Sequence, residues 1–193
     1  WAVLDDSAAS VIVEAHEVNG KPNPLGAWVM PRDHAETDFY FFGYGRRYTE
    51  AVQDFYKLAG PTPLLPRFAL GNWWSRYYRY TQDEYLQLMD RFKREGIPFT
   101  TSVIDMDWHR VDDVDPKYGS GWTGYSWNKQ LFPDHEAFLH DLHERGLKTT
   151  LNVHPRDGVR AFEDDYAAVA KRVGIDPATE EAVEFDLTNP DFV

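Results

Sequence analysis

Hydrophobic residues follow one period in the first quarter of the chain and another after it. The early part has short apolar runs such as 38–42 and a cluster of turn residues at 19–24, which is typical of β-strands. From Thr49, which can cap a helix, apolar residues recur at helical spacing until Gly60. The change of period predicts a domain boundary near residue 48.

Beyond this first helix, strand and helix patterns alternate. Local signals mark the expected helices: a capping box, in which Glu84 follows Thr81 by three positions, opens the first, Asp134 caps the second, and a glycine ends each of the three. The expected strands are 68–74, 99–105 and 148–154, and the expected helices run from Thr81 to Gly96, from Asp134 to Gly146 and from about Arg160 to Gly174.

Alternation with short connections predicts parallel strands joined by right-handed crossovers, as in a doubly wound sheet or a (β/α)8 barrel. The first expected strand runs into Asn-Trp-Trp-Ser-Arg-Tyr at 72–77 and not into a glycine-rich phosphate loop, so a dinucleotide-binding sheet loses its main support. The sequence therefore predicts an α/β fold, a partial (β/α)8 TIM barrel of about three strand–helix units preceded by a β-rich segment.

Composition narrows the class of ligand. The 193 residues are 42% hydrophobic and include 7 Trp, 11 Tyr and 12 Phe, more aromatic side chains than a core of this size requires, so some are free to stack on the flat faces of sugars. The formal net charge of −12 repels phosphate backbones and anionic membrane surfaces, so neither nucleic acid nor a membrane is an expected partner.

The chain has no cysteine, which excludes a disulfide framework and a thiolate metal site. It has no long apolar run and no signal-peptide pattern, so the compartment stays open, with a soluble cytoplasmic protein slightly favoured. It begins with Trp1, and residues 188–192 read as the start of a new element. We therefore expect the chain to be an excerpt of a longer protein.

Chemically useful side chains gather where the expected strands end, which is where a (β/α)8 barrel builds its active site. Carboxylate, imidazole and guanidinium groups beside indole and phenol rings suit a carbohydrate, because rings stack on C–H faces while the charged groups bind hydroxyls. The strand-end residues are Trp73, Trp74, Arg76, Tyr77 and Tyr78, then Asp105, Asp107, Trp108 and His109, then His154, Arg156 and Asp157, and a long loop adds Trp122, Tyr125 and Trp127.

Four of these segments, in this order, resemble successive blocks of glycoside hydrolase family 31: Leu-Gly-Asn-Trp-Trp-Ser-Arg-Tyr at 70–77, Val-Ile-Asp-Met-Asp-Trp-His at 103–109, Gly-Trp-Thr-Gly-Tyr at 121–125 and Leu-Asn-Val-His-Pro at 151–155. The resemblance implies a retaining α-glycoside hydrolase, α-glucosidase-like, acting on terminal α-linked sugars without a cofactor. It also implies that residues 1–48 end an N-terminal β-sandwich and that residues 49–193 are the N-terminal part of the catalytic barrel.

The resemblance further implies roles for single residues. Asp105 matches the aspartate that holds hydroxyls of the terminal sugar in the −1 subsite. Tyr77 stands where many relatives carry a tryptophan, and His154 where many carry an aspartate. The nucleophile and the acid/base are expected beyond Val193, so no catalytic residue is assigned. The expected substrate-binding residues are Asp105, Asp107, Trp108, His109, Trp74, Arg76, Tyr77 and His154.

Simpler interpretations stand beside these. Asp105 and Asp107 are not expected to form the retaining pair, because alternate residues of a strand point to opposite faces. Asp107 and Arg76 are equally suited to structural ion pairs, and Trp122 and Trp127 to packing their loop. No metal is expected, because His109 and His154 lack a zinc motif and the acidic run 112–115 lacks the spacing of a calcium loop.

Other functions fit the same pattern. An α-transglycosylase or an α-N-acetylgalactosaminidase would use the same scaffold, and a non-catalytic carbohydrate-binding module would use the same aromatic residues. An unclosed barrel exposes strand edges. We therefore expect an oligosaccharide or α-glycoside as substrate, and the remaining portion of the catalytic domain or a second copy of the chain as the partner that covers these edges.

Overall fold

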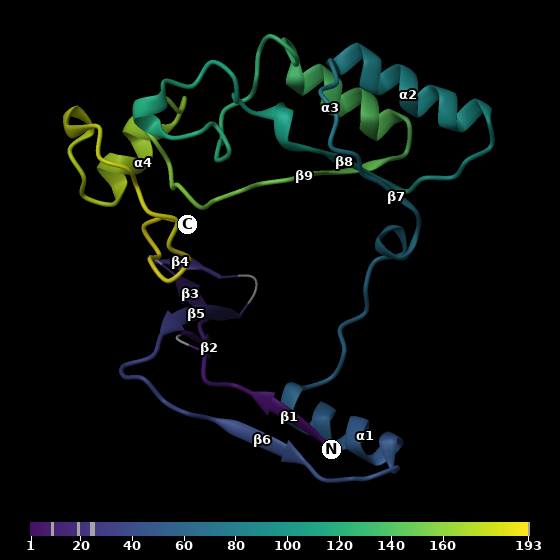
Figure 1. Cartoon of the computed structure of the whole chain (residues 1–193), viewed down its shortest axis with the longest axis vertical. Coiled ribbons are helices and arrows are strands. Elements are labelled where there is room, and N and C mark those ends of the chain that lie inside the picture. Colours follow the sequence, from purple (N-terminus) through teal and green to yellow (C-terminus); the bar gives the residue numbers. More distant parts are fainter. Residues whose placement is uncertain (9, 19, 24–25, 193) are drawn as a thin grey trace. The chain divides into compact units, whose positions relative to one another are not determined.

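The computed structural model describes residues 1–8, 10–18, 20–23 and 26–192, and it divides into two compact units (Figure 1). The N-terminal unit contains residues 1–64 together with 186–191, and the sheet–helix unit contains residues 65–185 together with Phe192. None of the helices in these described ranges combines the length and the apolar character that a bilayer span needs.

The N-terminal unit consists of antiparallel strand pairs and one helix, as the β pattern predicted. Each strand pairs with a single partner within the described part of this unit. The turn cluster at 19–24 lies partly outside the described residues. The pairs are β1 (Ala2–Asp5) with β6 (Phe39–Phe42), β2 (Ser10–Glu14) with β5 (Ala27–Pro31), and β3 (Glu17–Val18) with β4 (Lys21–Pro22).

The helix of this unit, α1, spans Tyr48–Ala59 and ends at Gly60, whose φ of 77° lies in the left-handed region that glycine favours. The expected helix is confirmed, but its expected cap is wrong. Thr49 lies inside the first turn, and the N-cap position belongs to Arg47, whose side chain makes no capping hydrogen bond.

The sheet–helix unit contains a parallel three-stranded sheet in the order β7-β8-β9, with helices between and after its strands (Figure 1). The alternation of strand and helix is therefore confirmed for this unit. The strands are β7 (Trp73–Trp74), β8 (Thr101–Ile104) and β9 (Lys148–Leu151), and the helices are α2 (Gln82–Arg94), α3 (His135–Glu144) and α4 (Tyr166–Arg172).

Several boundaries differ from the prediction. The expected strands 99–105 and 148–154 are shorter, Thr101–Ile104 and Lys148–Leu151. The expected strand 68–74 is wrong in its first half, where Arg67–Leu70 form a 3-10 helix. The Thr100 hydroxyl donates to the carbonyl oxygen of Phe68 at 2.7 Å, so a side chain takes the place of a neighbouring strand. The third helix begins at Tyr166 and not near Arg160.

The expected caps of α2 and α3 are confirmed. The backbone N–H of Glu84 donates to the Thr81 hydroxyl at 3.2 Å, and the backbone N–H of Thr81 donates to the Glu84 carboxylate at 2.9 Å. At α3, the Asp134 carboxylate accepts from the backbone N–H of Ala137 at 3.0 Å. Each pair satisfies N–H groups that the first turn of a helix leaves open.

The main core lies between the sheet and the two helices α2 and α3, which cover the same face (Figure 1). Arg145, just beyond α3, adds a two-pronged ion pair with Asp90 of α2 at 2.9 and 3.0 Å, and this guanidinium lowers the pKa of Asp90. The buried apolar residues of this core are Tyr85, Met89, Ile104, Trp108, Phe132, Phe138, Leu142 and Leu147.

Candidate functional site

The carboxyl ends of β8 and β9 bring Asp105 and Asn152 together. The Asn152 side-chain amide donates to the Asp105 carboxylate at 2.7 Å, and the same carboxylate oxygen accepts from the backbone N–H of Met106 at 2.8 Å. The backbone N–H of Asn152 donates to the Ile104 carbonyl at 2.9 Å. The backbone hydrogen bonds between β8 and β9 therefore set the position of Asn152. Asp105 is thus a fixed, half-buried acceptor at the sheet edge where its role was expected.

Asn152 itself was missed as a site residue by sequence reasoning. The sequence placed Asn152 inside the expected strand 148–154, whereas β9 ends at Leu151 and Asn152 follows it directly. Asn152 lies beside Asp105 because Ile104 pairs with Leu151 in the register of β8 and β9. That register cannot be read from the sequence.

Asp107 follows Asp105 in a turn and not in a strand. β8 ends at Ile104, and Met106–Trp108 form a 3-10 helix. The alternation of strand faces, which was expected to separate Asp105 from Asp107, therefore does not apply here. Asp107 is half-buried and lies close enough to His109 for its charge to favour the protonated imidazole.

Two tryptophans expected to bind substrate pack in or against the core. Trp108 is only 4% exposed, and its indole N–H donates to the Asn152 carbonyl at 2.8 Å. The Trp74 ring lies 4.7 Å from the Phe92 ring and 5.9 Å from the Phe99 ring, centroid to centroid. The expectation is corrected for Trp108, whose buried ring lies in the core. Trp74 is only partly buried, so its expected contact with substrate stays a prediction.

His109 is enclosed as well. Its side chain is 0% exposed, and its Nδ1 lies 2.9 Å from the Arg110 carbonyl oxygen. Burial is the largest cause that lowers the pKa of His109, and the neighbouring His154 lowers it further. The imidazole is therefore a neutral interior group, and its expected contact with substrate does not fit its position.

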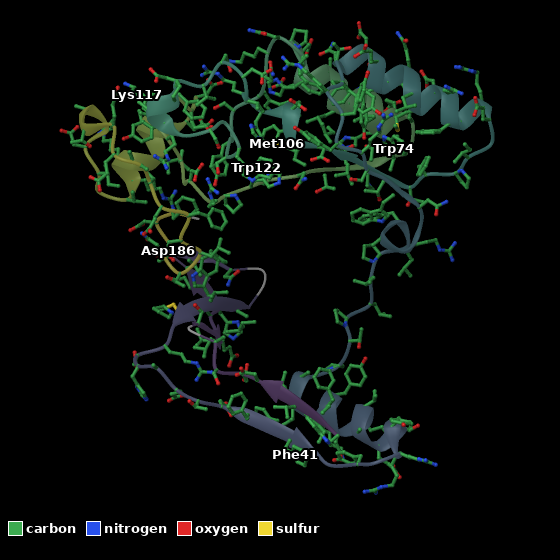
Figure 2. All side chains as sticks on the ribbon, in the orientation of Figure 1. Phe41, Trp74, Met106, Lys117, Trp122 and Asp186 are labelled. Atoms are coloured by element: carbon green, nitrogen blue, oxygen red, sulfur yellow. The ribbon has the colours of Figure 1, made fainter. Side chains whose placement is uncertain are left out.

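Trp122 and His154 form an aromatic pair beside this edge. Trp122 belongs to the loop of residues 121–128 between β8 and α3, here named the tryptophan loop. Figure 2 labels Trp122 among the side chains of the sheet–helix unit. Its ring centroid lies 4.7 Å from that of His154, which follows β9. Trp122 is 45% exposed, so one aromatic surface stays open to solvent.

The second tryptophan of the loop, Trp127, packs against neighbouring aromatic rings. The Trp127 ring stacks at 4.8 Å on His135 and lies 5.6 Å from the Phe132 ring, so it packs the loop onto α3. Of the two residues for which binding and packing were equally expected, Trp127 packs, and Trp122 keeps a surface exposed to solvent.

Arg76 and Tyr77 lie on the exposed segment between β7 and α2. The Arg76 guanidinium lies 4.7 Å from the centre of the Tyr78 ring, a cation–π contact. Within the described ranges, no hydrogen bond or ion pair links either residue to Asp105, and none of the ion pairs involves Arg76.

Glu163 was also missed by sequence reasoning. It is 5% exposed, and its carboxylate accepts from the Ser126 hydroxyl at 2.5 Å and from the backbone N–H of Tyr125 at 3.1 Å. Burial raises the pKa of Glu163, while these hydrogen bonds act in the opposite direction. No sequence signal identified it, because Phe162 and Tyr166 on either side fit a helical period.

The acidic run near residue 112 is structural. Asp112 pairs with Arg79, Asp113 pairs with Arg110 at 3.0 Å, and Asp115 accepts from the backbone N–H of Lys117 at 2.9 Å. In the described part of the chain, no group of three His, Cys, Asp or Glu side chains is arranged to hold a metal ion.

Comparison with known proteins gives a family. Residues 62–192 match the family model described as "Glycosyl hydrolases family 31 TIM-barrel domain". The chain is 29% identical over 127 residues to an alpha-xylosidase of Saccharolobus solfataricus, covering 65% of this chain and 16% of that protein. It is 29% identical over 119 residues to an alpha-glucosidase of the same organism, covering 62% and 15%.

Among solved structures, the chain is similar to the GH31 alpha-xylosidase from Xanthomonas citri, with a TM-score of 0.49, 16% identity, and coverage of 77% of this chain and 18% of that one. The chain thus spans less than a fifth of the length of these relatives. The match of the family model over most of the chain shows that it belongs to glycosyl hydrolase family 31.

Proposed function

We propose that this chain is part of a retaining α-glycoside hydrolase that acts on terminal α-linked sugars, and that it supplies substrate-binding residues. The observation that carries the proposal is the Asp105–Asn152 pair at the carboxyl ends of β8 and β9, with Trp122 and His154 beside it. The alpha-xylosidase and alpha-glucosidase names of the relatives support an α-linked xylose or glucose as the sugar.

In this proposal the domain organisation follows the family. Residues 49–193 are the N-terminal part of a (β/α)8 barrel, in which further strands pair with the edges of the sheet β7-β8-β9, and residues 1–48 end a β-sandwich. The parallel order of β7-β8-β9 supports the barrel and the antiparallel pairs before residue 48 support the β-sandwich, although the compact units divide after Leu64, so that α1 lies in the N-terminal unit. In such a barrel, sugars bind at the carboxyl ends of the strands, where Asp105 lies.

Asp105 accepts hydrogen bonds from sugar hydroxyls. One of its carboxylate oxygens already accepts from the Asn152 amide and the Met106 N–H, which leaves the second oxygen and the negative charge for the ligand. Hydrogen bonds to a charged partner contribute about 1.5–3 kcal/mol each. Asn152 orients the carboxylate before the sugar arrives, so little side-chain conformational entropy is lost on binding.

The aromatic pair supplies the apolar half of recognition. The exposed surface of Trp122 stacks on the C–H face of a sugar ring, and the His154 imidazole, tilted against the indole at 4.7 Å between ring centroids, supports it. Asp107, Arg76 and Tyr77 remain proposed ligands at the rim of the same edge.

The two carboxyl groups that do the chemistry are proposed to come from another part of the whole protein. A retaining mechanism needs a nucleophile and an acid/base about 5–5.5 Å apart. Asp105 is committed to Asn152 and to hydroxyl binding, so we do not assign Asp105 and Asp107 to these roles.

The test uses the whole protein that carries this chain. Aryl α-xyloside and aryl α-glucoside are offered, and the anomer released first is followed by NMR. We expect the α-anomer first. We also expect Asp105→Ala to lower kcat/KM about 10²-fold or more, from the loss of one or two charged hydrogen bonds. Asp113→Ala, which removes an exposed carboxylate paired with Arg110, is the matched control. Release of the β-anomer first would overturn the retaining mechanism.

A further inference from the structure

The tryptophan loop is attached to the segment that follows β9 at several points. The Thr123 hydroxyl accepts from the backbone N–H of Asp157 at 3.0 Å. Further along the loop, the backbone N–H of Tyr125 and the hydroxyl of Ser126 both donate to Glu163. The exposed ring of Trp122 lies directly before these attachments, so its place against His154 depends on them.

Glu163 is the centre of this attachment. Its two carboxylate oxygens accept from two different residues of the loop, one oxygen from Tyr125 and the other from Ser126. The Ser126 hydroxyl in turn accepts from the backbone N–H of Asp164 at 2.7 Å. Because that hydroxyl oxygen already accepts there, its own proton points to Glu163.

The carboxylate of Glu163 suits these two donors better than the side-chain amide of a glutamine would. Both donors point at acceptor oxygens, whereas glutamine offers one acceptor and one N–H2 group. In a glutamine variant, either Tyr125 or Ser126 faces a donor in place of an acceptor. Buried polar groups without a partner are costly, so the loop would shift to relieve the mismatch.

We propose that Glu163 is a positioning residue for substrate: its buried carboxylate fastens the tryptophan loop to the segment after β9 and thereby sets the Trp122 ring against His154. The inference rests on the proposed function, because the Trp122 surface matters for catalysis only if a sugar stacks there. Glu163 itself does not touch the ligand, since it is 5% exposed and both of its oxygens are engaged.

The test compares Glu163→Ala, Glu163→Gln, Trp122→Ala and the double variant Glu163→Ala/Trp122→Ala in the whole protein. Asp164→Ala is the matched control, because Asp164 is the neighbouring acidic residue and its carboxylate makes an exposed ion pair with Lys129. For each variant, kcat and KM on an aryl α-glycoside are measured on the folded fraction, together with the imidazole proton shifts of His154, which sense the ring current of Trp122.

We expect Glu163→Ala to raise KM about tenfold and to move the His154 proton shifts toward those of Trp122→Ala, with a smaller change in Glu163→Gln. The double variant should be no worse than Trp122→Ala, because Glu163 acts through that ring. Asp164→Ala should match the wild type. If Glu163→Ala does not fold, Glu163→Gln carries the same comparison.

Unchanged His154 shifts in the Glu163 variants, or effects of Glu163 and Trp122 on KM that simply add, would overturn the inference. Its failure can be told apart from failure of the proposed function. If the wild type cleaves no α-glycoside, the proposed function is wrong, whereas the His154 shifts still show whether Glu163 positions Trp122.

Discussion

Replacing Gly124 by alanine tests whether the tryptophan loop and His109 are packed as tightly as the structure shows. A Cβ at Gly124 would lie 2.2 Å from Nδ1 of His109 and 2.6 Å from its Cγ, whereas ordinary contact begins at 3.4 Å. The ring cannot move aside into solvent, because it is 0% exposed and its Nδ1 lies 2.9 Å from the Arg110 carbonyl oxygen. Either the loop or the imidazole must shift.

The cost follows from two contributions. Overpacking of a filled interior costs about 1–3 kcal/mol, and displacement of the imidazole from the Arg110 carbonyl adds about 1 kcal/mol for the lost hydrogen bond. We therefore expect Gly124→Ala to lower the free energy of unfolding by about 2–4 kcal/mol. Urea unfolding followed by tryptophan fluorescence measures this change as a lower midpoint with an unchanged slope.

A double-mutant cycle with His109→Ala isolates the steric cause. Removing the imidazole makes room for the new methyl group, so Gly124→Ala should cost much less in the His109→Ala background than in the wild type. Equal costs in both backgrounds, or a cost under about 0.5 kcal/mol in the wild type, would refute the packing argument, since surface changes away from such contacts stay within that range.

Three further predictions concern stability. Thr81→Ala removes the hydroxyl that caps α2 and should lower the free energy of unfolding by about 1 kcal/mol in urea titrations; no change would mean that the cap is not formed in solution. Leu142→Ala empties a fully buried site and should cost about 2–5 kcal/mol; a midpoint equal to that of the wild type would contradict the core assignment. Because burial raises the pKa of Glu163 above its ordinary value of 4.5, the folded chain binds its proton more tightly than the unfolded chain, and that contribution is lost as pH rises through the folded-state pKa. The stability of the wild type relative to Glu163→Gln should therefore fall as pH rises from the ordinary value of 4.5 through the raised folded-state pKa. Urea midpoints of the two proteins that change with pH in the same way would contradict this.

Helices were predictable here because their signals are local. Thr81 and Glu84, or Asp134 and the N–H group of Ala137, lie within one turn of each other, so the sequence alone contains both partners. The 3-10 helix at Arg67–Leu70 depends on Thr100, a partner distant in sequence, and no pattern within 68–74 could show it.

The position of Asp105 at a strand end was predictable, but its contacts were not. Asp105 lies at a strand end as expected, but its partner Asn152 depends on the register between β8 and β9. The burial of Trp108 follows from a turn that begins when the Asp105 carboxylate accepts from the Met106 N–H. Glu163 is set by contacts with a loop that precedes it by many residues, and such contacts leave no periodic signal.

The indole N–H of Trp108 donates to the carbonyl of Asn152 from inside the core, while the side chain of Asn152 holds Asp105. This buried indole proton is therefore linked to the geometry of Asn152 and Asp105 at the ends of β9 and β8. Its exchange with deuterium requires the end of β9 to open. The exchange rate of this single indole proton is thus a direct reading, in solution, of how often the Asp105 edge comes apart.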